Sequence, residues 1–381
     1  MKTSEATPSG RLEYLDLIRG VFILVMIEGH TLRLFLSPEV KAMAVYQYQD
    51  MIHNLTGPVF LFAAGAAYVY STRSRWEIFR RWGPKLRSRL SKWLVVLVIG
   101  FALQVTFGTL RRTLAETTSD QLAYLLSLNI LQCIVFSLLL LQSLTMIVPN
   151  WQWFFRASVI GALGIAFLTP FAWEYGQQGP IWLASLLSGR SRSIFPLVPY
   201  AGFAFAGAAW GYLHLLAREQ AREATFLRRC AGYAAGLCIA NYFVGYLPLP
   251  EVYSHFWSTS PFSFLVRVGI LTLIVVGARL AEPHIQPRLS TLAVAGKQSL
   301  LIYVLHLPIL YGSAFNPDTS LRKALGVPLP VGDAVLGWLG LTVLMVAVAV
   351  WWDWWREDHA WQARGVWWLV VGYYSYRFFL E

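Results

Sequence analysis

The chain has 381 residues, of which 56% are hydrophobic and only 13% are charged, and its mean hydropathy is +0.51. These values exclude an ordinary water-soluble globule, in which about a quarter of the residues are charged. The formal net charge of +11 does not indicate a nucleic-acid-binding surface, because the basic residues gather in short connections between apolar runs. The three cysteines form no CxxC pair, so neither a disulfide framework nor a zinc site is indicated.

Apolar runs long enough to cross about 30 Å of hydrocarbon recur along the whole chain. The sequence therefore predicts an all-α, polytopic transmembrane helix bundle with 10–11 spans. We expect residues 1–12 to form a cytoplasmic N-terminal segment and residues 13–381 to form a single transmembrane domain. The predicted spans lie near 15–36, 53–71, 92–110, 123–147, 154–173, 196–216, 230–248, 262–281, 292–313 and 334–354; the aromatic stretch 366–379 is an eleventh span or an interfacial helix.

The short loops predict the orientation, because Lys and Arg are retained on the cytoplasmic side of a membrane. The segment after the second span is strongly basic and contains a single acid, Glu77. This loop and the N terminus are therefore expected in the cytoplasm. The basic residues of the segment are Arg73, Arg75, Arg80, Arg81, Lys85, Arg87, Arg89 and Lys92.

The first predicted span holds several ionisable residues. Arg19 and His30 are eleven residues apart, which is three helical turns plus about 20° and about 16 Å of rise, so they share one face. Asp16 lies one turn from Arg19 and can pair with it. A charge at mid-membrane costs at least about 2.5–3.5 kcal/mol, so each needs a partner, a water-filled cavity or a function. The alternatives are an interfacial salt bridge for Asp16 and Arg19, and a neutral imidazole bonded to a neighbouring helix for His30.

The second and fourth spans each add a polar side chain. His53 stands at the outer end of the second span. If the first two spans pack antiparallel, His30 and His53 line one cavity; otherwise His53 is an interfacial residue. In the fourth span, Gln132 follows Asn129 by one turn. Such amides in lipid commonly tie helices together, and this remains the alternative to a binding role.

The ninth predicted span contains the polar stripe with the most residues. Ser299, Tyr303 and His306 follow an i, i+4, i+7 spacing and therefore lie on one helical face. Pro308, just beyond them, predicts a kink that frees backbone carbonyls.

The sequence contains no HExxH, GxSxG, Walker or GxGxxG motif, which argues against a zinc enzyme, a membrane hydrolase, an ATPase and a dinucleotide enzyme. Membrane histidines with an arginine and an acid on one face fit proton transfer. Two function classes remain. One is a histidine-assisted group transfer. The other is a proton-coupled transporter or flippase of a polar or lipid-linked solute. A third alternative is a membrane protein that has no catalytic activity and acts as a partner of another protein.

Five segments, in order, resemble a known family. The first carries D-x-x-R-G and Arg-x10-His, and it resembles the first catalytic-domain span of heparan-alpha-glucosaminide N-acetyltransferase and its bacterial relatives. The likeness extends to the broader membrane acyltransferase-3 family and runs from about residue 11 to 315. The segments are RLEYLDLIRGVFILVMIEGH (11–30), HNLTGPVFLFAAG (53–65), NILQ (129–132), TSPFSFLVRVG (259–269) and GKQSLLIYVLH (296–306).

This resemblance implies an acyl-CoA-dependent integral membrane acyltransferase in the bacterial inner membrane. An acetyl or short acyl group would pass from cytosolic acetyl-CoA or another acyl-CoA to a hydroxyl or amino group of a sugar-like or cell-envelope acceptor. The expected partners are acyl-CoA, a carbohydrate or envelope acceptor and membrane lipid, with no metal and no nucleic acid.

The resemblance also implies roles for the polar residues. His30 would be the general base or would carry the acyl group briefly. In heparan-alpha-glucosaminide N-acetyltransferase, a lysosomal enzyme, the catalytic histidine lies further along the chain. His53 is therefore also predicted to be catalytic, and so is His306. The residues expected to bind acyl-CoA or to position the acyl transfer are Asp16, Arg19, Gln132, Ser299 and Tyr303.

Overall fold

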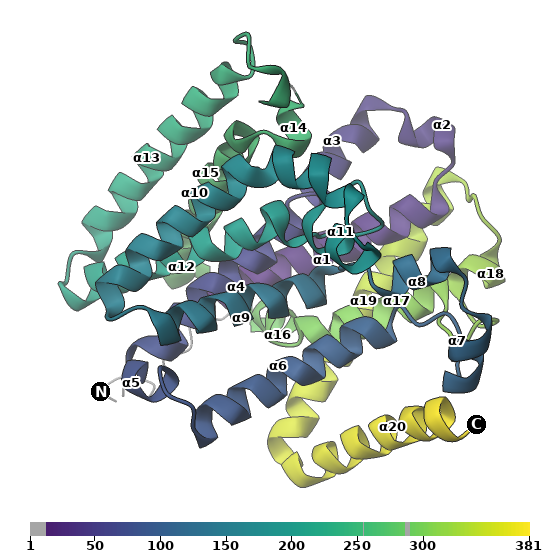
Figure 1. The fold of residues 1–381 in the computed structure, drawn as a ribbon. Coiled ribbons are helices and arrows are strands. Elements are labelled where there is room, and N and C mark those ends of the chain that lie inside the picture. Colours follow the sequence, from purple (N-terminus) through teal and green to yellow (C-terminus); the bar gives the residue numbers. More distant parts are fainter. Residues whose placement is uncertain (1–12, 254, 286–289) are drawn as a thin grey trace.

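The computed structural model describes residues 13–253, 255–285 and 290–381, and these residues form helices and loops with no strand among them. The expectation for residues 1–12 lies outside the described residues. Figure 1 shows long helices running side by side through the centre of the molecule, with α20 along one edge next to α19. The helices of 18 residues or more are α1 (Glu13–Phe35), α4 (Thr56–Arg73), α6 (Pro84–Ala102), α9 (Ile130–Ile147), α10 (Trp151–Tyr175), α12 (Leu197–Glu219), α13 (Glu223–Val244), α15 (Pro261–Ile285), α19 (Val331–Asp358) and α20 (Ala360–Leu380).

Shorter helices connect and cap these long ones. Two of them, α16 and α17, belong to the functional region described below. The shorter α-helices are α2 (Pro38–Lys41), α3 (Ala44–His53), α5 (Trp76–Phe79), α7 (Leu110–Glu116), α8 (Ser119–Leu125), α11 (Ile181–Leu187), α14 (Phe256–Thr259), α16 (Ser290–Lys297), α17 (Ser299–Tyr311) and α18 (Leu321–Leu325).

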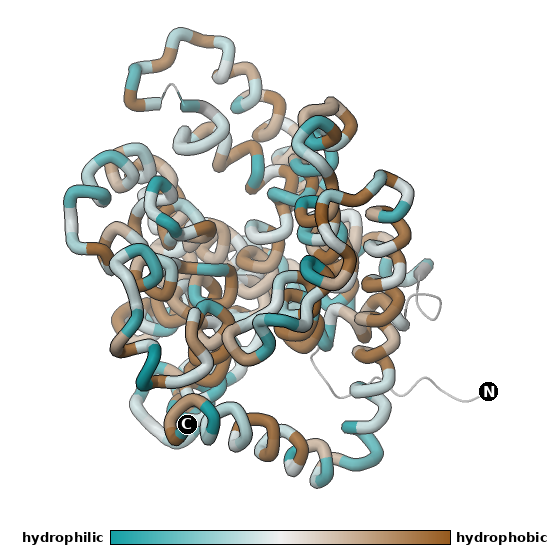
Figure 2. The backbone as a smooth tube through the Cα atoms, turned by 90° about the vertical axis from the view of Figure 1, so that its right-hand side faces the viewer, coloured by the Kyte–Doolittle hydropathy of each residue, from teal (hydrophilic) through white to brown (hydrophobic). Residues whose placement is uncertain are grey.

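Length and apolar composition confirm a polytopic helical membrane protein. Within the described ranges, five helical segments are long and apolar enough to cross a membrane, and a bent pair of helices raises the number to six. The remaining predicted spans fall on α1, α6, α12, α13 and α20, which are long enough but more charged or less apolar. Ten or eleven spans is therefore more than this criterion supports. In Figure 2 the hydrophobic colour follows the helices and the hydrophilic colour marks many of the turns. The five segments are Ala44–Arg73, Ile130–Ile147, Trp151–Gln178, Pro261–His284 and Val331–Asp358.

The contact between α4 and α12 at the centre of the bundle depends on glycine. A Cβ atom added at Gly65 would lie 1.9 Å from the Ala204 carbonyl oxygen, and one added at Gly207 would lie 2.0 Å from the Phe62 carbonyl oxygen. Only a residue without a side chain lets the two backbones approach this closely, as in other membrane helix pairs.

We expect Gly207→Ala to lower the stability of the protein by about 1–3 kcal/mol, because the added methyl group forces α4 and α12 apart. Gly236→Ala in α13 is the matched control, since nothing lies within 4 Å of its added Cβ. Thermal unfolding in detergent measures both. Equal melting temperatures for the two variants would contradict the close-packing account.

The ninth predicted span is broken at Gln298, ahead of the predicted kink at Pro308. The chain bends by 79° between Thr291–Lys297 and Ser299–Tyr311, whereas Pro308 lies inside the continuous helix α17. Pro308 therefore does not interrupt the helix, and the break lies at Gln298, between the two helices. Side chains from α19 stabilise the actual break: Asp353 accepts hydrogen bonds from Lys297 Nζ at 2.8 Å and from Gln298 Nε2 at 2.6 Å.

Two glycines pack α16 tightly against α1. A Cβ atom on Gly20 would lie 2.0 Å from the Leu292 carbonyl oxygen, and one on Gly296 would lie 1.8 Å from the Asp16 carbonyl oxygen. This contact fixes the start of α17 relative to α1. As a result, the polar stripe of α17 faces the ionisable residues of α1.

Candidate active site

Two histidines meet where α1 and α17 pack together. His30 Nδ1 lies 2.9 Å from His306 Nε2, and the two rings are nearly parallel, with 7° between their planes. His306 is completely buried, and its Nδ1 lies 2.8 Å from the Ile302 carbonyl oxygen. Arg19 and Asp16, nearer the start of α1, form the expected ion pair at 3.6 Å.

These contacts determine which nitrogen of His30 can act as a base. A carbonyl oxygen only accepts hydrogen bonds, so His306 Nδ1 donates to Ile302 and His306 Nε2 carries a lone pair. That lone pair accepts from His30 Nδ1. In the neutral imidazole of His30, Nε2 is then the unprotonated nitrogen, which is the one that can take a proton from a substrate.

His53 joins the pair from the end of α3. Its ring centroid lies 5.4 Å from that of His30, at an edge-on angle of 65°. Its Nδ1 donates to the Val25 carbonyl oxygen at 3.3 Å, so its Nε2 is also unprotonated in the neutral form. A Cβ atom on Gly29 would lie 1.9 Å from His53 Nδ1, so the bare backbone at this position lets the ring approach α1. His30 and His53 are therefore neighbours, but neither is among the residues that line the cavity described below.

Polar contacts hold the backbone around the cluster of His30, His53 and His306. The Tyr311 hydroxyl donates to the His30 carbonyl oxygen at 3.0 Å. Arg33, one turn beyond His30, pairs with Asp50 of α3 at 2.6 Å. These bonds tie α17 and α3 to the same turn of α1.

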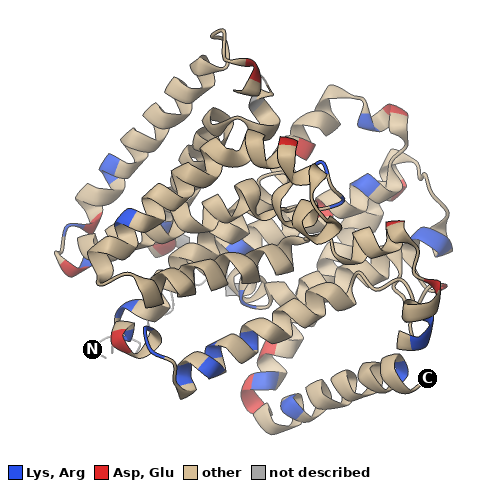
Figure 3. Cartoon of the chain, in the orientation of Figure 1, with Lys and Arg blue, Asp and Glu red and all other residues tan. Residues whose placement is uncertain are grey.

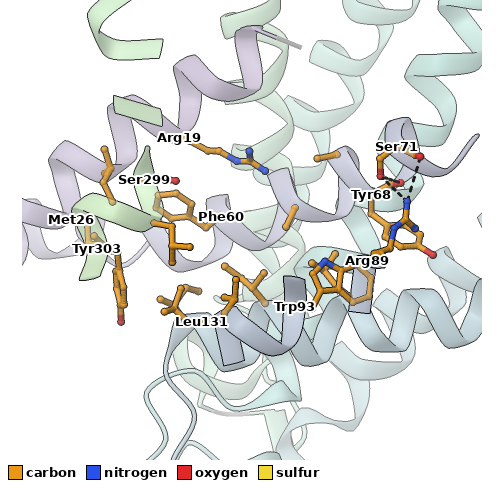
Figure 4. Close-up of a pocket in the computed structure, with 18 residues that line it drawn as sticks. Arg19, Met26, Phe60, Tyr68, Ser71, Arg89, Trp93, Leu131, Ser299 and Tyr303 are labelled. Carbon is orange, nitrogen blue, oxygen red and sulfur yellow. Dashed lines mark hydrogen bonds between the residues drawn. The ribbon is translucent and has the colours of Figure 1, made fainter. Parts of the chain in front are cut away.

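A cavity of about 410 Å³ runs between α1, α4, α6, α9 and α17. Its walls are mostly apolar, and its polar side chains lie at both ends and, for Arg19 and Ser299, between them (Figure 4). Figure 4 shows Arg89 with Ser71 and Tyr68 at one end and Tyr303 with Met26 at the other. The lining residues are Arg19, Ile23, Met26, Phe60, Ala64, Ala67, Tyr68, Ser71, Arg89, Trp93, Val96, Ile130, Leu131, Ile134, Leu138, Ser299, Leu300 and Tyr303.

Two arginines contribute to the cavity wall toward what we call the basic end. Arg19 is partly exposed beside Asp16. Arg89 lies over the Phe79 ring and donates hydrogen bonds to Thr72 Oγ1 at 3.0 Å and to Gln142 Oε1 at 3.2 Å. Figure 3 shows that basic residues mark the first half of α6. In the sequence Arg89 is one basic residue among several in the predicted loop 73–92, and no local pattern marks it as a cavity residue.

The other end of the cavity lies next to the histidines. Tyr303 lines it, one turn after Ser299 on α17, and the Tyr303 ring centroid is 5.7 Å from that of His306. Met26, another lining residue, is one helical turn before His30. The cavity therefore ends beside the histidine pair, although neither His30 nor His306 is among its lining residues.

Gln132 lies behind the side chains that line the cavity and does not reach the cavity itself. It is completely buried and donates from Nε2 to Gln104 Oε1, and Gln104 Nε2 donates in turn to the Ser127 hydroxyl at 2.8 Å. Its neighbours Ile130 and Leu131 line the cavity, whereas Gln132 is not among the lining residues. The geometry shows Gln132 connecting α9 to the segments around α8.

An apolar cavity with cationic groups toward one end and unprotonated imidazole nitrogens next to the other is the architecture of a membrane protein that moves a group or a proton. Within the part of the chain that the structure describes, no three His, Cys, Asp or Glu side chains are placed to hold a metal ion.

A family model described as an acyltransferase domain, that of the acyltransferase-3 family, matches residues 12–354. The chain belongs to this family and is a membrane acyltransferase. The broader of the two resemblances is thereby confirmed. A search of curated proteins finds no match.

Proposed function

We propose that the protein transfers an acetyl or short acyl group from cytosolic acyl-CoA to a hydroxyl or amino group of a sugar-like or cell-envelope acceptor. One observation carries this proposal: the cavity leads from Arg19 and Arg89 to Tyr303, directly beside the pair of His30 and His306. Within the acyltransferase-3 family, a closer relationship to heparan-alpha-glucosaminide N-acetyltransferase is part of the proposal.

The basic end suits the donor. Guanidinium groups bind phosphate through charge-assisted, bidentate hydrogen bonds, and the basic segment 73–92 attracts anions toward them. The apolar walls suit the pantetheine arm and the acyl chain. About 16 Å of helix rise separates Arg19 from His30, so an extended thioester arm can bridge the two. The proposal has the basic end and the N terminus on the cytosolic side of a bacterial inner membrane.

His30 is the proposed general base. Its Nε2 takes the proton from the acceptor hydroxyl while the acceptor oxygen attacks the thioester carbonyl carbon. The carbon–sulfur bond then breaks, and the imidazolium returns the proton to the CoA sulfur. Tyr303 and Ser299 stabilise the negative charge on the carbonyl oxygen, and His53 orients the acceptor. Asp16 holds Arg19, and Gln132 braces the wall that the acyl chain contacts.

A second candidate is a proton-coupled transporter or flippase of a polar or lipid-linked solute. The 79° break between α16 and α17 favours it, because broken helices commonly form solute sites in transporters. Solute flux into vesicles that contain no acyl-CoA separates this candidate from the enzyme.

Donor binding provides the test. We expect Arg19→Ala and Arg89→Ala each to raise the KM for acetyl-CoA about tenfold to hundredfold, because a hydrogen bond to a charged group contributes about 1.5–3 kcal/mol. Arg112→Ala is the control, since Arg112 is exposed and pairs with Glu116 at 2.9 Å, away from the cavity. An unchanged KM in both cavity variants would contradict the proposed donor site.

A further inference from the structure

Helix α3 has two chemically different faces. At 100° per residue, Tyr46, Gln49, Asp50 and His53 fall on one side. This side faces α1, because Asp50 pairs with Arg33 and His53 donates to the Val25 carbonyl oxygen. The opposite side is apolar and exposed. It consists of Val45, Tyr48, Met51 and Ile52.

Gln49 lies on the inner side with its amide unsatisfied. Both Nε2 and Oε1 are buried, and neither has a hydrogen-bond partner among the described residues. Leaving a buried donor or acceptor unpaired costs about 1–3 kcal/mol for each group. Gln49 is one turn before His53, whose ring contacts His30. The Gln49 side chain offers an NH2 group that donates and a carbonyl oxygen that accepts. Two adjacent hydroxyl groups of a ligand match this pair, because each hydroxyl can both donate and accept.

The exposed side of α3 indicates where such a ligand resides. The segment Ala44–Arg73 is 30 residues long, about 45 Å at 1.5 Å per residue. The 18 residues of α4 account for about 27 Å of this, which nearly covers the hydrocarbon layer. Helix α3 then lies in the headgroup layer. Helix α4 is mostly buried, so the exposed apolar side of α3 is the part of this segment that meets lipid, and Gln49 and His53 stand at the level of lipid headgroups.

We propose that the inner face of α3 is the acceptor subsite, where the Gln49 amide binds neighbouring hydroxyl groups of a membrane-anchored polyol and directs one hydroxyl to His30. This subsite rests on the proposed function, because its ligand is the acyl acceptor. It adds a recognition residue and a ligand class to that function.

The probe is a matched pair of glycosides, octyl β-D-glucopyranoside and methyl β-D-glucopyranoside, which share a headgroup and differ only in anchoring. Protein in lipid nanodiscs receives radiolabelled acetyl-CoA and either glycoside. We expect the octyl glycoside to have at least a tenfold lower KM than the methyl glycoside. Gln49→Leu should raise the KM for the octyl glycoside about tenfold to hundredfold, with a smaller change in kcat.

Gln47→Leu is the matched control on the same helix, because Gln47 is exposed and its amide donates to the Ala42 carbonyl oxygen. It should keep the wild-type KM. A purely structural role for Gln49 predicts a different result, since leucine in place of an unpaired buried amide raises the melting temperature and leaves the KM unchanged.

The outcomes distinguish failure of the proposed acceptor subsite from failure of the proposed function. Wild-type protein that cleaves acetyl-CoA but acylates neither glycoside, or acylates both with the same KM, overturns the membrane-anchored polyol. An unchanged KM in Gln49→Leu overturns the role of Gln49. Wild-type protein that fails to cleave acetyl-CoA contradicts the proposed function itself.

Discussion

His30→Ala is expected to lower kcat for acyl transfer by about 10³-fold, because the substitution removes the proposed general base and such bases contribute about 10²–10⁴-fold. The KM for acetyl-CoA should change little, since the arginines toward the opposite end of the cavity are unaffected. Release of CoA thiol, followed in purified protein, measures both parameters.

The control is His255→Ala, which removes an exposed histidine from the loop before α14. It should retain wild-type activity. Both variants should elute as single species of wild-type size in detergent. Full activity in folded His30→Ala protein would rule out His30 as the base.

Substitutions at His306 test how His30 is held. His306→Leu leaves His30 Nδ1 without its acceptor, and the cost of about 1–3 kcal/mol for the unpaired group favours moving the proton to Nε2. We therefore expect kcat to fall about tenfold to hundredfold. His306→Gln offers a carbonyl oxygen near the same place and should retain activity within about tenfold of wild type.

The difference between the two His306 variants is informative because a purely structural role would not depend on a hydrogen-bond acceptor. Steady-state kinetics and thermal unfolding of both proteins make the comparison. Equal kcat values for folded Leu and Gln variants would contradict a positioning role for His306. If the Leu variant does not fold, rates in the Gln variant close to those of wild type still support the role, and a hundredfold loss contradicts it.

The relation between α1 and α17 could be predicted in part from helical periodicity. Eleven residues place Arg19 and His30 on one face of a helix, and the i, i+4, i+7 spacing gathers Ser299, Tyr303 and His306. The structure brings the two faces together. These predictions depend only on local helical geometry, which the sequence specifies directly.

Features that depend on contacts between distant segments were not predictable in this way. Arg89 becomes a cavity residue only because α6 packs beside α9 and its side chain reaches Thr72 of α4. The break at Gln298 depends on Asp353, 55 residues away. The unpaired amide of Gln49 becomes visible only once α3 packs against α1. In each case the partner lies far along the chain, and periodicity carries no information about it.

Direct binding of acetyl-CoA to the purified protein tests the central claim, that the cavity leading from Arg19 and Arg89 to Tyr303 holds the acyl donor. Isothermal titration calorimetry in detergent should show saturable binding with one site per chain in wild type. Binding should weaken about tenfold to hundredfold in Arg19→Ala and remain close to wild type in Arg112→Ala. Folded wild-type protein that binds no acetyl-CoA, or binds it equally well in Arg19→Ala, would contradict the account.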